Sequence, residues 1–98
     1  MEDLKEELKE EYVLRCAKIC QEGYSKLSFS KEEIRTELME KYRNNGNEKE
    51  VSGLIIKIER AVFDFLDIKM SRGQRSFGWP HYHEETLMKE INTALQQA

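Results

Sequence analysis

Hydrophobic residues recur at steps of three and four along most of this 98-residue chain, which is the spacing of one face of an α-helix. Four stretches carry the pattern and predict helices over residues 3–22, 31–44, 48–68 and 84–97. The expected stripes are Leu4, Leu8, Tyr12, Cys16, Ile19 and Cys20 in the first, and Leu87, Met88, Ile91, Ala94 and Leu95 in the fourth. The sequence therefore predicts an all-α fold, a single-domain bundle of four helices, with a loop over residues 69–83 between the third and fourth.

The third predicted helix is apolar on more than one side. Its main stripe consists of Leu54, Ile55, Ile58, Val62 and Phe65. Ile56 and Phe63 lie off that stripe and point elsewhere. A helix that is apolar around much of its circumference is buried on more than one side, so we expect this helix to organise the core. If the other helices leave Ile56 and Phe63 uncovered, a second copy of the chain is expected to cover them, which predicts a homodimer.

Local signals mark where two of the helices begin. Ser30 is followed three residues later by Glu33, which is the pattern of a capping box, and Phe29 with Ile34 fits a hydrophobic staple. Asn47 stands where the third helix needs a cap on its first turn.

Composition limits the classes of protein to consider. Charged residues make up 36% of the chain, the net charge is −3 and the pI is near 5.5. An acidic chain is not expected to bind nucleic acid over its whole surface. No apolar run approaches the roughly 20 residues of a membrane span, and the acidic N-terminus is unlike a secretory signal, so we expect a cytoplasmic protein.

The two cysteines, Cys16 and Cys20, lie four residues apart on one predicted helical face, where they are expected to be buried thiols rather than a disulfide. Together with His81 and His83 they have the chemistry of zinc ligands. A pair of cysteines four residues apart on a regular helix is unlike the tight knuckles of structural zinc sites, however. The sequence therefore predicts neither a metal site nor a cofactor.

Residues 71–83, which read SRGQRSFGWPHYH, differ from the rest of the chain. They hold its only proline, its only tryptophan and both histidines, and they contain no acidic residue. With Lys69, the loop carries a charge of +3. Arginine beside exposed aromatic rings suits either stacked bases or a protein contact. The predicted contact residues are Lys69, Arg72, Arg75, Trp79 and His81.

A structural role for the same loop is an open alternative. Phe77 and Trp79 would then fold inward and close the end of the bundle, because a lone tryptophan in a small domain is usually mostly buried.

Three functions fit this chemistry to different degrees. The leading hypothesis is a non-enzymatic interaction or regulatory module that acts through protein contacts. The second is a small nucleic-acid-binding protein that uses the loop 69–83. The third is a metal-independent ribonuclease, because His81 follows Arg75 by six positions and the pair has the chemistry for general acid–base work on a phosphodiester.

A DNA-binding helix-turn-helix is disfavoured. The helix that would enter the groove begins with Glu48, Lys49 and Glu50, so two carboxylates would face the phosphates.

Overall fold

The computed structural model of the chain describes residues 2–22, 26–27, 29–44, 47–70 and 84–96. Within these ranges it contains no strand and four helices of twelve residues or more, which confirms the all-α four-helix prediction. The helices are α1 (Glu2–Cys20), α3 (Lys31–Tyr42), α4 (Glu48–Met70) and α5 (Glu84–Gln96).

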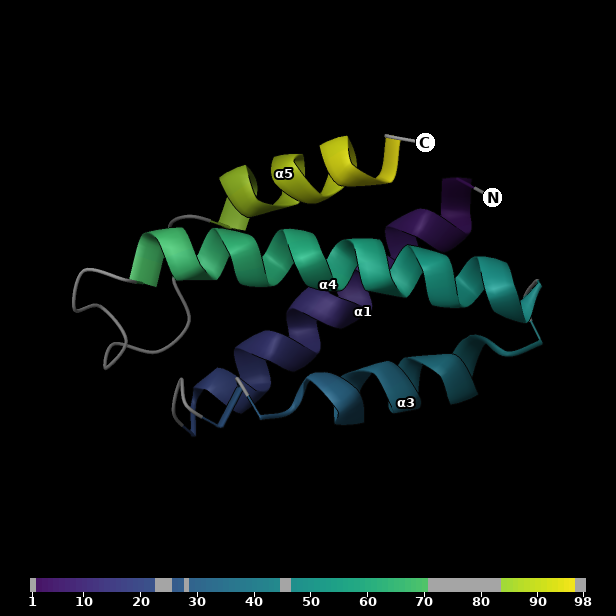
Figure 1. Cartoon of the computed structure of the whole chain (residues 1–98), viewed down its shortest axis with the longest axis horizontal. Coiled ribbons are helices and arrows are strands. Elements are labelled where there is room, and N and C mark those ends of the chain that lie inside the picture. Colours follow the sequence, from purple (N-terminus) through teal and green to yellow (C-terminus); the bar gives the residue numbers. More distant parts are fainter. Residues whose placement is uncertain (1, 23–25, 28, 45–46, 71–83, 97–98) are drawn as a thin grey trace.

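The long helix α4 lies at the centre of the bundle (Figure 1). It packs against α1, α3 and α5, with α5 along one side and α3 along the other, while α1 crosses α4 at an angle. The start of α1 and the end of α5 lie toward the same side of the bundle in the view of Figure 1. None of the described helices combines the length and the apolar composition that a bilayer span requires.

The core forms around α4, as the sequence predicts. Among the described residues this helix supplies the largest share of buried apolar side chains, namely Val51, Leu54, Ile55, Ile58, Val62, Phe63, Phe65 and Leu66. The predicted stripes of α1 and α5 also face inward, with Ile19, Met88 and Ala94 only half-buried. Because the inward faces of three helices converge on α4, this helix has apolar neighbours on several sides.

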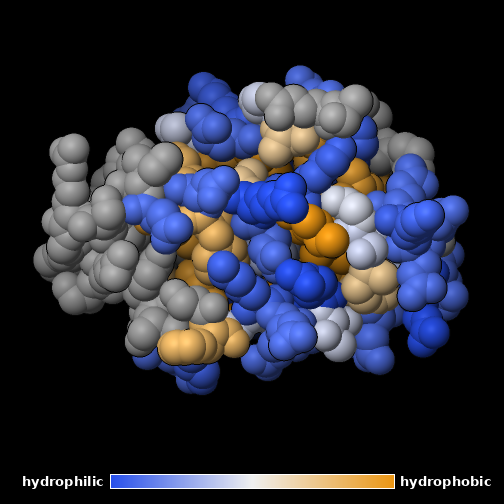
Figure 2. Space-filling model, in the orientation of Figure 1, coloured by the Kyte–Doolittle hydropathy of each residue, from blue (hydrophilic) through white to orange (hydrophobic). Residues whose placement is uncertain are grey.

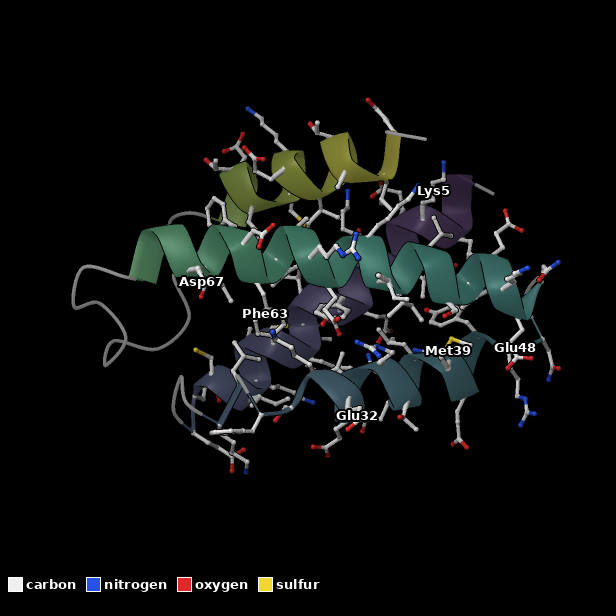
Figure 3. The ribbon with its side chains drawn as sticks, in the orientation of Figure 1. Lys5, Glu32, Met39, Glu48, Phe63 and Asp67 are labelled. Carbon is white, nitrogen blue, oxygen red and sulfur yellow. The ribbon has the colours of Figure 1, made fainter. Side chains whose placement is uncertain are left out.

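One expectation about α4 is wrong. Phe63 does not point away from the core, because its side chain is only 7% exposed and the Nζ of Lys31 lies 4.5 Å from the centre of its ring. Figure 3 shows Phe63 on the side of α4 that faces α3. Ile56 is half-buried. The apolar surface that motivated a homodimer at these two residues is therefore reduced mainly to Ile56.

Helices α3 and α4 run antiparallel (Figure 1), and two side-chain pairs join them in the first part of α3. Lys31 meets Phe63 near the start of α3, and one turn later Arg35 meets Glu59. Residues four apart on one helix share a face, so the two contacts fix the register of one helix against the other.

The starts of α3 and α4 are capped differently. The side chain of Asn47 accepts a hydrogen bond from the backbone amide of Lys49 at 2.8 Å, which confirms the predicted cap of α4. Ser30 makes no such bond; its hydroxyl instead donates to the carbonyl oxygen of Lys26 at 2.7 Å. The predicted capping box is therefore wrong. The staple is wrong as well, because Phe29 is 89% exposed and cannot be packed on the fully buried Ile34.

Helix ends also differ from the prediction by one to two residues. Helix α4 continues through Lys69 to Met70, so Lys69 belongs to its last turn and not to the loop. The first helix ends at Cys20, after which two turn bonds close the chain, from the amide of Gln21 to Lys18 and from that of Glu22 to Ile19. Helix ends commonly tighten in this way, and sequence periodicity does not register it.

Candidate interaction surface

The residues predicted to form a contact surface fall almost entirely outside the described part of the chain. Arg72, Arg75, Trp79 and His81 lie in residues 71–83, which the structure does not describe. Lys69 lies in the last turn of α4, and its side chain is likewise outside the description. Their convergence into one site stays a prediction.

The predicted state of the two cysteines is confirmed. Cys16 and Cys20 are both buried and both free thiols. Burial raises the pKa of Cys16, and the neighbouring Cys20 and Glu59 raise it further. A thiol with a raised pKa is a poor nucleophile and a poor metal ligand. In the described ranges, no cluster of three or more His, Cys, Asp or Glu side chains is placed to hold a metal, and both histidines lie outside those ranges.

A polar network inside the bundle joins three helices. Glu59 of α4 accepts a hydrogen bond from the hydroxyl of Tyr12 of α1 at 3.4 Å and one from Arg35 of α3 at 2.7 Å. Burial is the main cause that raises the pKa of Tyr12, so its hydroxyl keeps its proton and serves as a donor. The network thus holds α1, α3 and α4 together, and its carboxylate has two donors as a buried charge requires.

A second polar contact joins α1 to α5. Lys9 is only 5% exposed, and its ammonium donates to Glu6 at 3.0 Å and to Asn92 at 2.9 Å. The aliphatic stem of the lysine is covered while its charge is satisfied within the bundle. Both polar networks therefore connect helices to one another, and the Nε of Arg35 is the one buried side-chain nitrogen in the described ranges that has no hydrogen-bond partner.

The surface between α1 and α3 is hollowed. The hollow has a volume of about 400 Å³ and is lined by Glu7, Glu10, Glu11, Leu14, Lys41 and Tyr42. We call it the α1–α3 hollow. Leu14 at its edge is 56% exposed, although most large apolar side chains in the described ranges are buried.

Ion pairs fix one wall of the α1–α3 hollow. The carboxylate of Glu11 accepts hydrogen bonds from Arg15 and, at 2.7 Å, from the Nζ of Lys41. These bonds, that from Lys41 first, hold the pKa of Glu11 below its ordinary value. Arg15 also reaches Glu37 of α3 at 3.3 Å. Glu11 is therefore a bridge between α1 and α3, and two cations already balance its charge.

Two other carboxylates give the α1–α3 hollow negative charge. Glu7 and Glu10 are exposed, and Tyr42 beneath them is only 3% exposed. Burial raises the pKa of Tyr42, and a hydrogen bond with Glu7 contributes to the same shift. The hollow thus offers negative charge beside the apolar side chain of Leu14. A complementary ligand would carry a cation next to an apolar or aromatic group.

Two other surface features fit a ligand less well. Phe29 is highly exposed but stands by itself in the turn before α3, and single exposed apolar residues are common on protein surfaces. A second hollow of about 500 Å³ lies between Met39 and the start of α4 at Glu48 (labelled in Figure 3). Its other lining residues are Asn47, Lys49 and Ser52, so Met39 is the one large apolar side chain among these lining residues. On the face drawn in Figure 2, polar side chains separate the apolar ones into small areas.

Sequence reasoning missed the α1–α3 hollow because its parts come from two helices. The signal present in the chain is Leu14, which lies off the buried stripe of α1 and shares a helical face with Glu7, Glu10 and Glu11, because it follows them by seven, four and three positions. Glu59 is also conspicuous in the sequence, because it is a carboxylate within the apolar run of α4. No protein-family model matches the chain, and no match was found among curated proteins or solved structures.

Proposed function

We propose that this chain is a non-enzymatic interaction module that acts through protein contacts, with the α1–α3 hollow as a contact surface. The observation that carries the proposal is Leu14, a large apolar side chain left 56% exposed at the edge of a hollow that also presents Glu7 and Glu10. Contact surfaces commonly combine an apolar centre with a charged rim that selects the partner.

A cytoplasmic, regulatory role is part of the same proposal. Support comes from the two free thiols at Cys16 and Cys20, which suit a reducing compartment. The proposed partner is a protein, and a homodimer contact at the half-buried Ile56 is compatible with it, whereas Phe63 is packed within its own chain.

Site-directed photocrosslinking tests the proposed contact surface. The photoreactive residue benzoylphenylalanine replaces Leu14 in the full chain, and a second protein carries it at Asp64, which is exposed on α4. In a lysate of the source cell, we expect discrete protein adducts from position 14 that do not form from position 64.

Charge-reversal variants are the controls for the photocrosslinking experiment. Glu7→Lys/Glu10→Lys should abolish the adducts from position 14, whereas Glu32→Lys/Asp64→Lys, which changes the net charge equally at two other exposed carboxylates, should preserve them. Adducts that are identical from both positions, or that survive reversal of Glu7 and Glu10, would contradict the proposal.

Nucleic-acid binding by residues 69–83 is the second candidate, supported by Lys69, Arg72 and Arg75. Three phosphate contacts to a single strand predict a log–log salt slope of roughly −2. Low-micromolar binding of single-stranded RNA that Arg72→Ala/Arg75→Ala abolishes would rank this candidate first. We expect little affinity at physiological salt, because the rest of the chain is acidic and repels the phosphate backbone.

A further inference from the structure

We infer that the α1–α3 hollow binds the basic aromatic segment, residues 69–83, of a second copy of this chain. The inference rests on the proposed function and names its partner. It combines the chemistry of the hollow, the chemistry of the segment and the positions of the helix ends between which the segment runs.

The α1–α3 hollow requires an occupant that is both cationic and apolar. Glu11 is already paired with Arg15 and Lys41, whereas Glu7 and Glu10 form no ion pair among the described residues, and Glu7 also accepts a hydrogen bond from Tyr42. Leu14 adjoins them and offers apolar surface, and Tyr42 forms the base. A guanidinium or ammonium group at the carboxylates and a ring against Leu14 would satisfy both parts of the site.

The segment 69–83 has this composition. It carries Lys69, Arg72 and Arg75 without any acidic residue, and its aromatic residues Phe77, Trp79 and Tyr82 follow directly. The remainder of the chain is acidic, since the whole has a net charge of −3 and this segment alone has +3. The segment is therefore the part of the chain whose charge complements Glu7 and Glu10, and steering by opposite charge favours that encounter.

The helix ends argue that the segment comes from another copy. Tyr42 precedes the N-terminal end of α4, whereas the segment leaves from Met70 at its C-terminal end and returns at Glu84 (Figure 1). A helix of 23 residues is about 34 Å long. The residues 71–83 must leave and return, so they extend at most roughly 25 Å from these ends. Lys41 and Tyr42 lie at the end of α3 that is followed by the start of α4, so a segment from a second copy can approach this wall of the hollow without spanning the length of α4.

Binding of a labelled peptide tests the inference. The probe is a fluorescein-labelled peptide of residues 69–83, titrated with the full chain carrying Arg72→Ala/Arg75→Ala, so that the chain's own segment does not compete. Fluorescence anisotropy should show saturable binding. Adding Glu7→Lys/Glu10→Lys to the receptor should weaken the affinity by about tenfold or more, because two attractive charge pairs become repulsive.

Two further variants separate a specific site from general charge attraction. Leu14→Ala should weaken binding several-fold without changing charge. Glu32→Lys/Asp64→Lys should leave the affinity within about twofold, since Glu32 lies on the side of α3 away from α4 (Figure 3) and Asp64 is exposed on α4. Circular dichroism of each variant checks that the helices are retained.

The outcomes also separate this inference from the proposed function. An absence of saturable binding, equal loss with both charge-reversal pairs, or equal binding of a peptide with the same residues in shuffled order would overturn the inference. If photocrosslinks from position 14 still depend on Glu7 and Glu10 in that case, the proposed function stands with a different partner. If position 14 gives no crosslinks that depend on Glu7 and Glu10, both the inference and the proposed function are wrong.

Discussion

Ile58 shows what a single core residue contributes to this fold. It is fully buried near the middle of α4, where neighbouring helices leave no water to replace a lost side chain. Ile58→Ala should lower the free energy of unfolding by about 2–5 kcal/mol, through lost apolar burial and the cavity that remains. Urea denaturation measures the change. Leu14→Ala, at an exposed position, should cost less than about 0.5 kcal/mol, and a loss as small for Ile58→Ala would refute the central role of α4.

The network of Tyr12, Glu59 and Arg35 should behave as one unit. Tyr12→Phe removes the buried hydroxyl that donates to Glu59 and should cost about 0.5–1.5 kcal/mol of unfolding free energy. Glu59→Gln weakens the bond to Arg35 and is also destabilising. Because both changes act on one carboxylate, the double variant should lose less than the sum of the two, by about 0.5 kcal/mol or more. Strict additivity in the same denaturation assay would show that the three residues are not coupled.

Residues of the core could be predicted from the sequence, and residues of the polar contacts could not. Leu54, Ile58 and Val62 repeat at the helical period, so the burial of each follows from its spacing. Phe63 lies off that repeat, and its burial depends on Lys31 of another helix. The pairing of Glu59 with Arg35 likewise joins residues whose proximity exists only after α3 has packed on α4.

At the scale of the helices, the cap of α4 provides a clear test. Asn47→Ala should cost about 1 kcal/mol, because the amide of Lys49 loses its acceptor, and Asn47→Asp should retain most of the stability. Thermal or urea denaturation measures both. Asn47→Gly should cost only a few tenths of a kcal/mol. Equal losses for alanine and aspartate would mean that the side-chain oxygen of Asn47 is not a cap in solution.

The pairing of α1 with α3 should weaken in acid. The pKa of Glu11 lies below its ordinary value of 4.5, mainly because Lys41 and Arg15 donate to its carboxylate. A group with a lowered pKa stabilises the folded state above its unfolded pKa, and the contribution disappears as the pH falls through the folded pKa. The difference in unfolding free energy between wild type and Glu11→Gln should be constant from about pH 5 to 7 and shrink below about 4.5.

The exposure of Glu11 limits how much its ion pairs contribute to stability. Glu11 is partly exposed, so its contribution is expected to be at most about 1 kcal/mol. Glu10→Gln is the matched control, because it removes a carboxylate from the same helix without touching either ion pair. A difference for Glu11→Gln that grows toward low pH would have the wrong sign and would contradict the account.

Helix positions could be predicted to within two residues, but the local chemistry at helix starts was predicted correctly only at Asn47. Ser30 has the sequence pattern of a capping residue, yet its hydroxyl donates to Lys26 because the chain before it turns back on itself. Phe29 is consequently exposed. The competing turn lies in residues 26–30, before the pattern of Ser30 and Glu33 begins, so that pattern alone does not contain it.

For the molecule as a whole, the bundle and its central helix follow from sequence periodicity, whereas the α1–α3 hollow does not. Its walls come from residues 7–14 and 41–42, and only the packing of two helices brings them together. The basic aromatic segment was conspicuous in the sequence by composition, but its counterpart was not. Helical spacing alone places Glu7 and Glu10 beside Leu14, whereas only the packing of α1 on α3 brings Lys41 and Tyr42 to the same hollow.

Sedimentation equilibrium of charge-swapped chains tests the central claim most directly. The wild type should have a mass above the 11.7 kDa of one chain. Glu7→Lys/Glu10→Lys and Arg72→Glu/Arg75→Glu should each sediment as single chains, because each pairs like charge with like charge. An equimolar mixture should regain the higher mass, since each variant then offers the other a complementary partner. A wild type that remains a single chain at every concentration, or a mixture that does not associate, would contradict the account.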